Sequence, residues 1–185
     1  SKASSGVLNV IPAPCEVGVL LEQVQGEYAE RLHAHDLNLI VQTPDKTLTV
    51  LADGRHLGRI FDNLMNNIIK YAQPGTRVYL DARAGLDPAA PGGSRPVAVI
   101  TFRNVSAEPL NIPAEELLER FVRGDASRHT EGSGLGLAIV QSLTELQGGS
   151  LQLTIDGDLF KVRLTFPLYT PADAAQAASS GKETP

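Results

Sequence analysis

The sequence has few of the residues that define several common protein classes. It contains one cysteine, one methionine and no tryptophan among 185 residues. The lone Cys15 excludes an intramolecular disulfide framework, and no spacing of cysteine with histidine matches a zinc site. No run of about eighteen apolar residues occurs, so we expect neither a membrane-spanning helix nor a signal peptide in this sequence.

An excess of positive charge is also absent. The sequence has 16 basic and 21 acidic residues, which gives a net charge of -5 and a pI near 5.3. One short basic cluster stands out, formed by Arg120, Arg123 and Arg128. This charge balance argues against a surface that binds nucleic acid.

Length and composition predict one globular domain. With 185 residues, 42% of them hydrophobic, the chain can bury a single sizeable core. We place this domain at residues 7–168, after a flexible start at residues 1–6. Residues 169–185 are small, polar and aperiodic, which predicts a disordered tail.

Two common phosphate-binding motifs are missing. The sequence has no G-x-x-x-x-G-K-[ST], which excludes a P-loop, and its glycines do not follow the dinucleotide spacing G-x-G-x-x-G. The run Asp156-Gly157-Asp158 lacks the remaining ligands of a calcium loop. It is interpreted as a hairpin turn between two strands.

A cluster of glycines at alternate positions is present instead, in the run Gly132-Ser-Gly-Leu-Gly-Leu137. Apolar residues then recur at helical spacing until Gly148-Gly149. The glycines therefore occupy the start of a helix, where free backbone N–H groups and the helix dipole favour anions.

A second helix, over residues 59–73, has an unusual polar face. Its apolar stripe is formed by Leu57, Ile60, Phe61, Leu64 and Ile68, and the opposite stripe by Asn63, Asn66, Asn67 and Lys70, with Tyr71 at the edge. Such a stripe can simply be solvated. However, asparagine is a poor helix former, so three amides on one stripe favour a site in which carboxamide oxygens bind Mg²⁺ and the lysine binds phosphate.

Together these features resemble the catalytic ATP-binding domain of two-component sensor histidine kinases, within the GHKL or Bergerat-fold superfamily. The likeness rests on the N-x-x-x-N-x-x-K-Y helix, the G-x-G-L-G-L helix start and their order. Residues 116–132 between them are similar to the phenylalanine-containing box and ATP lid of those kinases. Asp53 and Gly148-Gly149 resemble the flanking "aD" and "gG" pairs. The resemblance covers residues 9–167.

The resemblance implies that Mg-ATP is bound and assigns roles in binding it. Asn67 would coordinate Mg²⁺, Asn63 would support the same region, and Lys70 would contact phosphate. Asn67, Lys70 and Arg123 are the expected catalytic residues. The other expected contacts are Tyr71 at the base or ribose, Arg123 and Arg128 from the lid, and the backbone of Gly132, Ser133, Gly134, Leu135, Gly136 and Leu137.

One motif of those kinases is altered here. They usually carry D-x-G-x-G after the central strand, with the aspartate binding the adenine amino group. This sequence has Arg103-Asn104-Val105-Ser106 instead. Asn104 can replace the aspartate, because its carboxamide accepts a hydrogen bond from the amino group and donates one to a ring nitrogen.

The expected fold is an α+β two-layer sandwich, with a mixed sheet of about five strands covered on one face by three helices. We predict strands near residues 7–10, 37–42, 47–51, 77–82, 97–104, 151–155 and 159–166. Helices are expected at residues 17–34, 59–73 and from Gly134, with a short turn of helix at 115–119. An exposed loop is expected at residues 85–95.

By resemblance, the domain transfers the γ-phosphoryl of Mg-ATP to a histidine on a separate dimerisation domain, for relay to a response regulator. We expect it to be the cytoplasmic part of a membrane-bound sensor kinase, without nucleic-acid binding or membrane insertion of its own. The four histidines are judged surface or lid residues, since none lies in an H-[ED]-x-x-x-P context. Two alternatives are open: a GHKL ATPase of another class, or a degenerate kinase domain that serves as a docking module.

Overall fold

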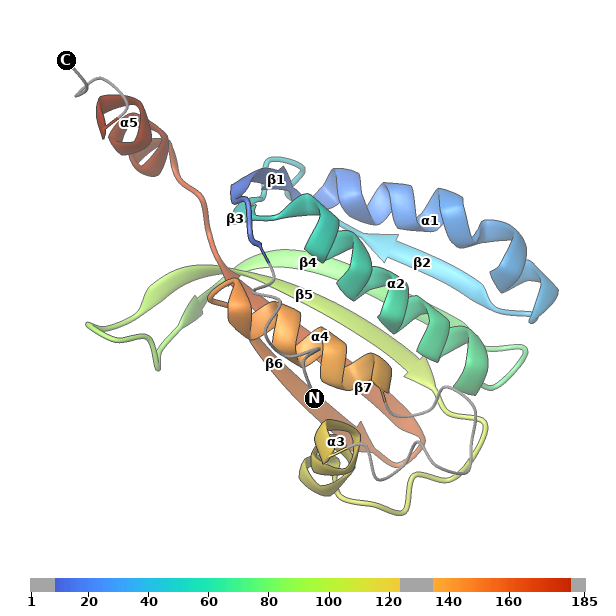
Figure 1. The fold of residues 1–185 in the computed structure, drawn as a ribbon. Helices are drawn as coiled ribbons and strands as arrows, with labels where there is room; N and C mark the ends of the chain where they lie inside the picture. Colours follow the sequence, from blue (N-terminus) through green and yellow to red (C-terminus); the bar gives the residue numbers. More distant parts are fainter. Residues whose placement is uncertain (1–8, 124–134, 181–185) are drawn as a thin grey trace.

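The computed structural model describes residues 9–123 and 135–180. Most of these residues form two layers, a mixed sheet and a set of helices on one of its faces, and the last described helix projects away from both layers (Figure 1). The helices are α1 (Val17–Ala34), α2 (Gly54–Tyr71), α3 (Ala114–Arg123), α4 (Leu135–Leu146) and α5 (Pro171–Ser180). The strands are β1 (Ala13–Glu16), β2 (Asn38–Gln42), β3 (Thr49–Ala52), β4 (Arg77–Asp87), β5 (Arg95–Val105), β6 (Ser150–Asp156) and β7 (Leu159–Pro167).

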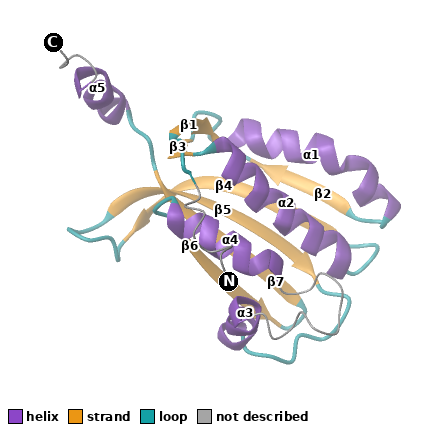
Figure 2. Cartoon of the chain, viewed as in Figure 1, coloured by secondary structure: helices purple, strands orange, loops and turns teal. Residues whose placement is uncertain are grey.

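The five-stranded sheet has the order β2-β4-β5-β7-β6, in which β2 and β4 are parallel and the other pairs are antiparallel. A separate two-stranded sheet pairs β1 with β3. Helices α1, α2 and α4 cover one face of the large sheet, as Figure 2 shows. The predicted mixed five-stranded sheet with three covering helices is therefore confirmed.

The core lies between these layers. The α2 residues Leu57, Ile60 and Phe61 are at most 1% exposed, and the Phe61 ring meets that of Phe102 on β5 with centroids 5.6 Å apart. Burial of these side chains is the main force that holds α2 on the sheet. The apolar stripe expected from the sequence is thus the packed face of α2.

Several predicted elements differ in extent. The first described strand is β1, at Ala13–Glu16, which pairs with β3. Of the strand predicted near residues 7–10, residues 9 and 10 are not in a strand, and residues 7 and 8 lie outside the described residues. The loop expected at 85–95 is shorter, since β4 and β5 continue their pairing to Asp87 and Arg95. The proline and glycine content of this segment predicted a loop where the structure has the outer part of the β4–β5 hairpin. Helix α3 is also longer than the predicted turn.

The predicted disorder was wrong for residues 171–180, which form α5. The Thr170 backbone N–H and hydroxyl both donate to a carboxylate oxygen of Asp173 at 2.7 Å, and the Asp173 N–H lies 3.3 Å from the Thr170 hydroxyl. This is a reciprocal capping arrangement, and Pro171 at the first helical position supports it. Capping and alanine content offset the lack of an apolar stripe.

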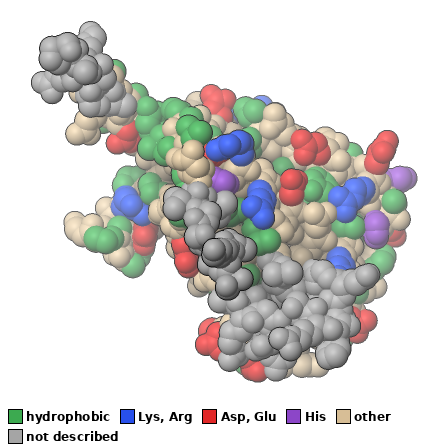
Figure 3. Space-filling view, in the orientation of Figure 1, with side chains coloured by type: hydrophobic (Ala, Val, Ile, Leu, Met, Phe, Trp, Pro, Cys, Tyr) green, Lys and Arg blue, Asp and Glu red, His purple; other side chains and the backbone are tan. Residues whose placement is uncertain are grey.

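On the side of the helices, acidic and basic side chains are interspersed without a continuous patch of one sign (Figure 3). Among the described residues, no helix combines the length and the apolar content that a bilayer crossing requires.

Candidate functional site

Helix α2 presents the carboxamides that the sequence singled out. The helix begins after Asp53, whose carboxylate accepts a hydrogen bond from the Arg55 backbone N–H at 3.0 Å as an N-cap. It ends at Tyr71, where Ala72 turns to extended backbone ahead of Pro74. Its apolar stripe faces the sheet, so the orientation of the polar stripe is determined by packing.

The start of α4 lies against the carboxamides of α2. A Cβ placed on Gly136 would be 3.4 Å from Asn63 Oδ1 and 3.5 Å from both polar atoms of the Asn67 carboxamide. The glycine therefore allows the first turn of α4 to approach both amides closely. Asn63 and Asn67 are half-buried. The amides and the glycine-rich helix start thus converge on one place.

The third asparagine of the stripe turns elsewhere. The Oδ1 atom of Asn66 accepts a hydrogen bond from Arg31 on α1 at 2.9 Å. Tyr28, one turn earlier on α1, donates to Asp62 of α2 at 2.8 Å. The polar stripe is therefore divided between two neighbours, α1 on one side and α4 on the other. Asn66 stabilises the contact with α1 and does not join Asn63 and Asn67.

The last turn of α2 carries Lys70 and Tyr71. The Lys70 ammonium lies 5.4 Å from the centroid of the Tyr71 ring, and both side chains are exposed. The backbone beyond the helix pairs with the end of β5: the Gln73 N–H donates to Val105 O at 2.8 Å, and the Ala107 N–H donates to Tyr71 O at 2.8 Å. These bonds bring the segment after β5 alongside the last turn of α2.

Asn104 lies at the end of β5. Ala98, Ile100 and Phe102 of this strand belong to the core, so the alternation of side chains places Asn104 on the same, helix-covered face. Its side chain is only 4% exposed. An amide at the buried end of an otherwise apolar row of side chains is suited to a specific polar contact.

The structure describes the other predicted site residues only in part. The side chain of Leu137 is 2% exposed in the core, so any contact with a ligand is left to its backbone. Arg128, Gly132, Ser133 and Gly134 lie outside the described residues. For Arg123 and Leu135 the helical backbone is described and the side chain is not.

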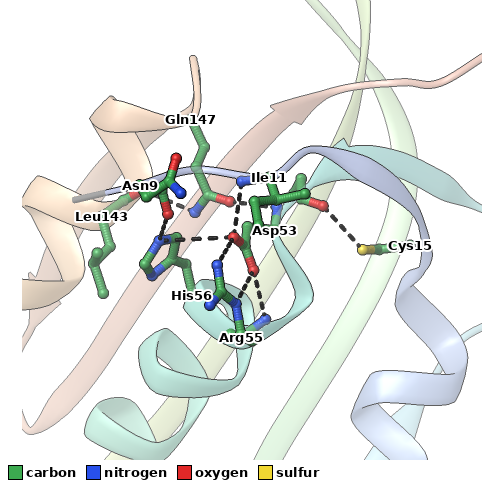
Figure 4. A network of polar contacts seen from close by, with 9 residues as sticks. Asn9, Ile11, Cys15, Asp53, Arg55, His56, Leu143 and Gln147 are labelled. Carbon is green, nitrogen blue, oxygen red and sulfur yellow. Dashed lines mark hydrogen bonds and ion pairs between the residues drawn. The ribbon is translucent and has the colours of Figure 1, made fainter. Parts of the chain in front are cut away.

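A second polar cluster lies at the opposite end of the α2–α4 pair (Figure 4). The Asp53 carboxylate is 2% exposed and accepts hydrogen bonds from the Ile11 N–H at 2.9 Å and from the Arg55 guanidinium at 2.8 and 3.2 Å. The Asp53 N–H donates to Gln147 Oε1 at 2.8 Å, and Gln147 Nε2 donates to Leu143 O at 2.9 Å. Asp53 thus joins the N-terminal segment, α2 and the end of α4.

The charge of Asp53 is stabilised by these partners. Hydrogen bonds from the Arg55 side chain, followed by the one from Ile11, hold the pKa of the Asp53 carboxyl well below its usual range. Sequence reasoning placed Asp53 before the helix and missed Gln147, which lies 94 residues later. No local pattern could have revealed that contact.

His56 corrects the judgement that all four histidines are surface or lid residues. Its side chain belongs to the buried set, with 9% exposure, and Nε2 lies 3.0 Å from Asn9 O. The same nitrogen is 3.8 Å from the Asp53 carboxylate. Its place near the start of α2, beneath the N-terminal segment, accounts for its burial. His33 and His35 are exposed as expected, and His129 lies outside the described residues.

The described residues include no group of three or more histidine, cysteine, aspartate or glutamate side chains that could hold a metal ion. The amides that meet Gly136 offer neutral oxygen donors instead. Such donors suit a hard cation that already carries its own anionic ligands, as Mg²⁺ does when it is chelated by a triphosphate. The donor set is therefore compatible with a metal that enters together with a nucleotide.

Comparison with protein families gives one matching family model. Residues 52–170 match the family described as histidine kinase-, DNA gyrase B-, and HSP90-like ATPase. This range contains α2, β4, β5, α4 and the final hairpin, and thus both helices that converge at Gly136.

Curated relatives are sensor proteins. The chain is 31% identical over 154 residues to the signal transduction histidine-protein kinase BaeS of Escherichia coli, covering 82% of this chain and 31% of BaeS. It is 29% identical over 150 residues to the sensor protein VanS of Enterococcus faecium, covering 80% of this chain and 36% of VanS. The chain thus spans about a third of the length of these relatives.

Solved structures share the fold. The catalytic domain of the histidine kinase ThkA matches with a TM-score of 0.70 at 18% identity, covering 85% of this chain and 95% of that one. Full-length ShkA in complex with AMPPNP matches with a TM-score of 0.70 at 24% identity, covering 90% of this chain and 33% of that one.

Proposed function

The chain belongs to the histidine kinase-, DNA gyrase B- and HSP90-like ATPase family and is an ATP-binding domain of the kind found in sensor histidine kinases; from this premise we propose how it acts. It binds Mg-ATP between α2 and the start of α4, and donates the γ-phosphoryl to a histidine on a separate dimerisation domain. A response regulator then receives the phosphoryl group.

The observation that carries this proposal is the approach of Gly136 to Asn63 and Asn67. The carboxamides supply neutral oxygen and nitrogen atoms on one side, and the N-terminal turn of α4 supplies backbone N–H groups on the other. Oxygen ligands and N–H donors that face one point suit a cation and the phosphates that bind it. The solved ShkA structure is a complex with AMPPNP, an ATP analogue, and this likeness supports a nucleotide here.

The polar residues of α2 at this site then position the metal and the phosphates. Asn67 holds Mg²⁺, Asn63 supports the same region, and Lys70 in the last turn of α2 contacts phosphate. Bound Mg²⁺ neutralises phosphate charge and favours loss of the γ-phosphoryl. Because phosphoryl transfer needs little covalent help from the protein, orientation and charge carry most of the effect.

The remaining contacts belong to the base and the lid. Tyr71 contacts the base or ribose, and the buried Asn104 binds the adenine edge through its amide. Arg123 and Arg128 approach the phosphates from the lid, and the backbone of residues 132–137 encloses them. The whole kinase is proposed to be a membrane-bound sensor with this domain on the cytoplasmic side.

Calorimetry with Mg-ADP tests the nucleotide site. Wild type should bind, and Asn67→Ala should weaken binding by about 100-fold, since a hydrogen bond or ligand to a charged group contributes about 1.5–3 kcal/mol. Asn66→Ala is the matched control. It removes an amide one residue away that bonds to Arg31 instead, so its affinity should equal that of wild type.

Two outcomes would contradict the nucleotide site. An absence of heat with wild-type protein would favour a docking module that binds no nucleotide, and equal losses in Asn66→Ala and Asn67→Ala would remove the special role of the α4-facing amides.

Labelled ATP tests the transfer step. None of the four histidines lies in an H-[ED]-x-x-x-P context, so this chain incubated with γ-labelled ATP should remain unlabelled. Addition of the dimerisation domain of its own kinase should place label on that domain's histidine. Strong labelling of this chain alone would contradict the proposed division of roles.

A further inference from the structure

The face of the sheet away from the helices has its own composition. On β5, Ala98, Ile100 and Phe102 point into the core, so Val99, Thr101 and Arg103 point to the other face. The register between strands extends this assignment across the sheet: Arg103 pairs with Tyr79 on β4 and with Lys161 on β7. We call this surface the helix-free face, since α1, α2 and α4 all lie on the opposite side in Figure 1.

Basic side chains gather on the helix-free face. The alternation on the described strands assigns it six basic residues, Arg77, Arg83, Arg95, Arg103, Lys161 and Arg163, and three acidic residues, Asp81, Asp87 and Asp156. The face is therefore positive in a chain whose net charge is -5. This asymmetry contrasts with the interspersed charges on the helix side (Figure 3).

Arg103 is held in place at the centre of this surface. One of its guanidinium nitrogens lies 2.6 Å from an oxygen of Asp81, which is 3% exposed, and the guanidinium lies 5.3 Å from the centroid of the Tyr79 ring. Arg83 reaches the other oxygen of Asp81 at 3.3 Å. The Nε atom of Arg103 is buried and has no hydrogen-bond partner. Its orientation is thus already set before any partner arrives.

Two hollows border the same rows of side chains. One, of ≈ 750 Å³, is lined by Arg77, Tyr79 and Val105 among others. The other, of ≈ 560 Å³, is lined by Gln42, Asp81 and Arg83 among others. The surface therefore combines two hollows, an arginine held in a fixed orientation and an aromatic ring. Arginine and tyrosine are enriched where protein partners bind most strongly.

We propose that the helix-free face docks an acidic surface of a partner protein. Carboxylates match its charge, and the planar guanidinium of Arg163, which is exposed and lies one row from the Arg103–Lys161 pair, can bind a carboxylate through two parallel hydrogen bonds. A protein is favoured over nucleic acid or an anionic bilayer, because the acidic remainder of the chain repels an extended polyanion. This proposal is independent of the nucleotide site.

Fluorescence anisotropy at low ionic strength with labelled oligo-L-glutamate, an acidic peptide short enough to lie on the helix-free face alone, tests the proposal. Wild type should bind this acidic polypeptide, and Arg163→Glu should weaken the binding about tenfold, because like charges then face each other. Arg31→Glu is the matched control. It changes the net charge of the chain by the same amount on α1, on the helix side, and should weaken the binding less than about twofold.

Thermal unfolding of both variants verifies that they fold, and the exposed Arg163→Ala provides a milder variant with an intermediate affinity. The proposal is overturned if wild type does not bind oligo-L-glutamate, or if Arg31→Glu and Arg163→Glu weaken binding equally. Tighter binding to single-stranded DNA or to phosphatidylserine vesicles, with the same dependence on Arg163, would overturn the assignment to a protein partner.

Discussion

The two ends of the antiparallel α2–α4 pair use their polar groups in different ways. At the closed end, formed by Asp53, Gln147 and Gly149, the polar side chains bond to other parts of the protein. At the open end, formed by Asn63, Asn67 and Gly136, the amides lie against a helix start, and a Cβ at Gly136 would be 3.4 to 3.5 Å from both of them. The difference suggests that the closed end fixes the two helices so that the open end can bind a ligand.

The largest expected effect comes from Gly149→Ala at the closed end. Its Cβ would lie 2.6 Å from the backbone oxygen of Thr165 and 2.9 Å from the Phe166 ring, so β7 or α4 must move. We expect a loss of about 3 kcal/mol in the free energy of unfolding, measured by urea titration.

Gly148→Ala is the control for that change. Gly148 has φ +77° and open space around it, so only backbone strain applies, and the loss should be about 1 kcal/mol. Equal losses in the two variants would show that the close approach of Gly149 to β7 has little influence on stability.

At the open end, Gly136→Ala should lower the affinity for nucleotide without lowering the stability of the fold. The new methyl group would sit in ordinary contact with Asn63 and Asn67, at 3.4 to 3.5 Å, so the fold should tolerate it. It would occupy space in front of both amides, and we expect affinity for Mg-ADP to fall about tenfold in calorimetry. The melting temperature should stay equal or rise, because alanine is the better helix former. Unchanged affinity would contradict an open end that holds the nucleotide.

Gln147→Ala should give the opposite profile at the closed end. It removes the hydrogen bonds to the Asp53 N–H and to Leu143 O, and the unfolding free energy should fall by about 1 kcal/mol. Nucleotide affinity measured under conditions where the variant is folded should match wild type. A large loss of affinity with little loss of stability would mean that the two ends do not have separate roles.

The last prediction concerns the charge of Asp53 and is measured in acid. Because hydrogen bonds from Arg55 and Ile11 lower the pKa of Asp53 in the folded protein, its contribution to stability is present above the unfolded pKa of about 3.9. That contribution is lost as the pH falls through the lower folded pKa. The urea midpoint of wild type should therefore fall more steeply below about pH 4 than that of Asp53→Asn. Parallel profiles for the two proteins would contradict a stabilising role of this charge.

Periodicity predicted the open end better than the closed end. The apolar stripe of α2 and the glycines at the start of α4 are local patterns, and they correctly predicted two helices and the face that α2 buries. The stripe predicted for α4 was only partly correct, because Leu143 is buried but Leu146 is 48% exposed. The patterns could not tell Asn66 from Asn67, because both lie on the exposed stripe of the isolated helix. Arg31 on one side and Gly136 on the other decide which amide serves which neighbour.

The sequence by itself determined the mixed α+β architecture, the apolar face of α2 and the glycine-containing start of α4, since each follows from spacing along a few turns or strands. Only the tertiary structure decided the bonds among Ile11, Asp53 and Gln147, the burial of His56 and the positive helix-free face. Those features join residues from distant segments, so they depend on strand register and helix packing. No local pattern encodes that information.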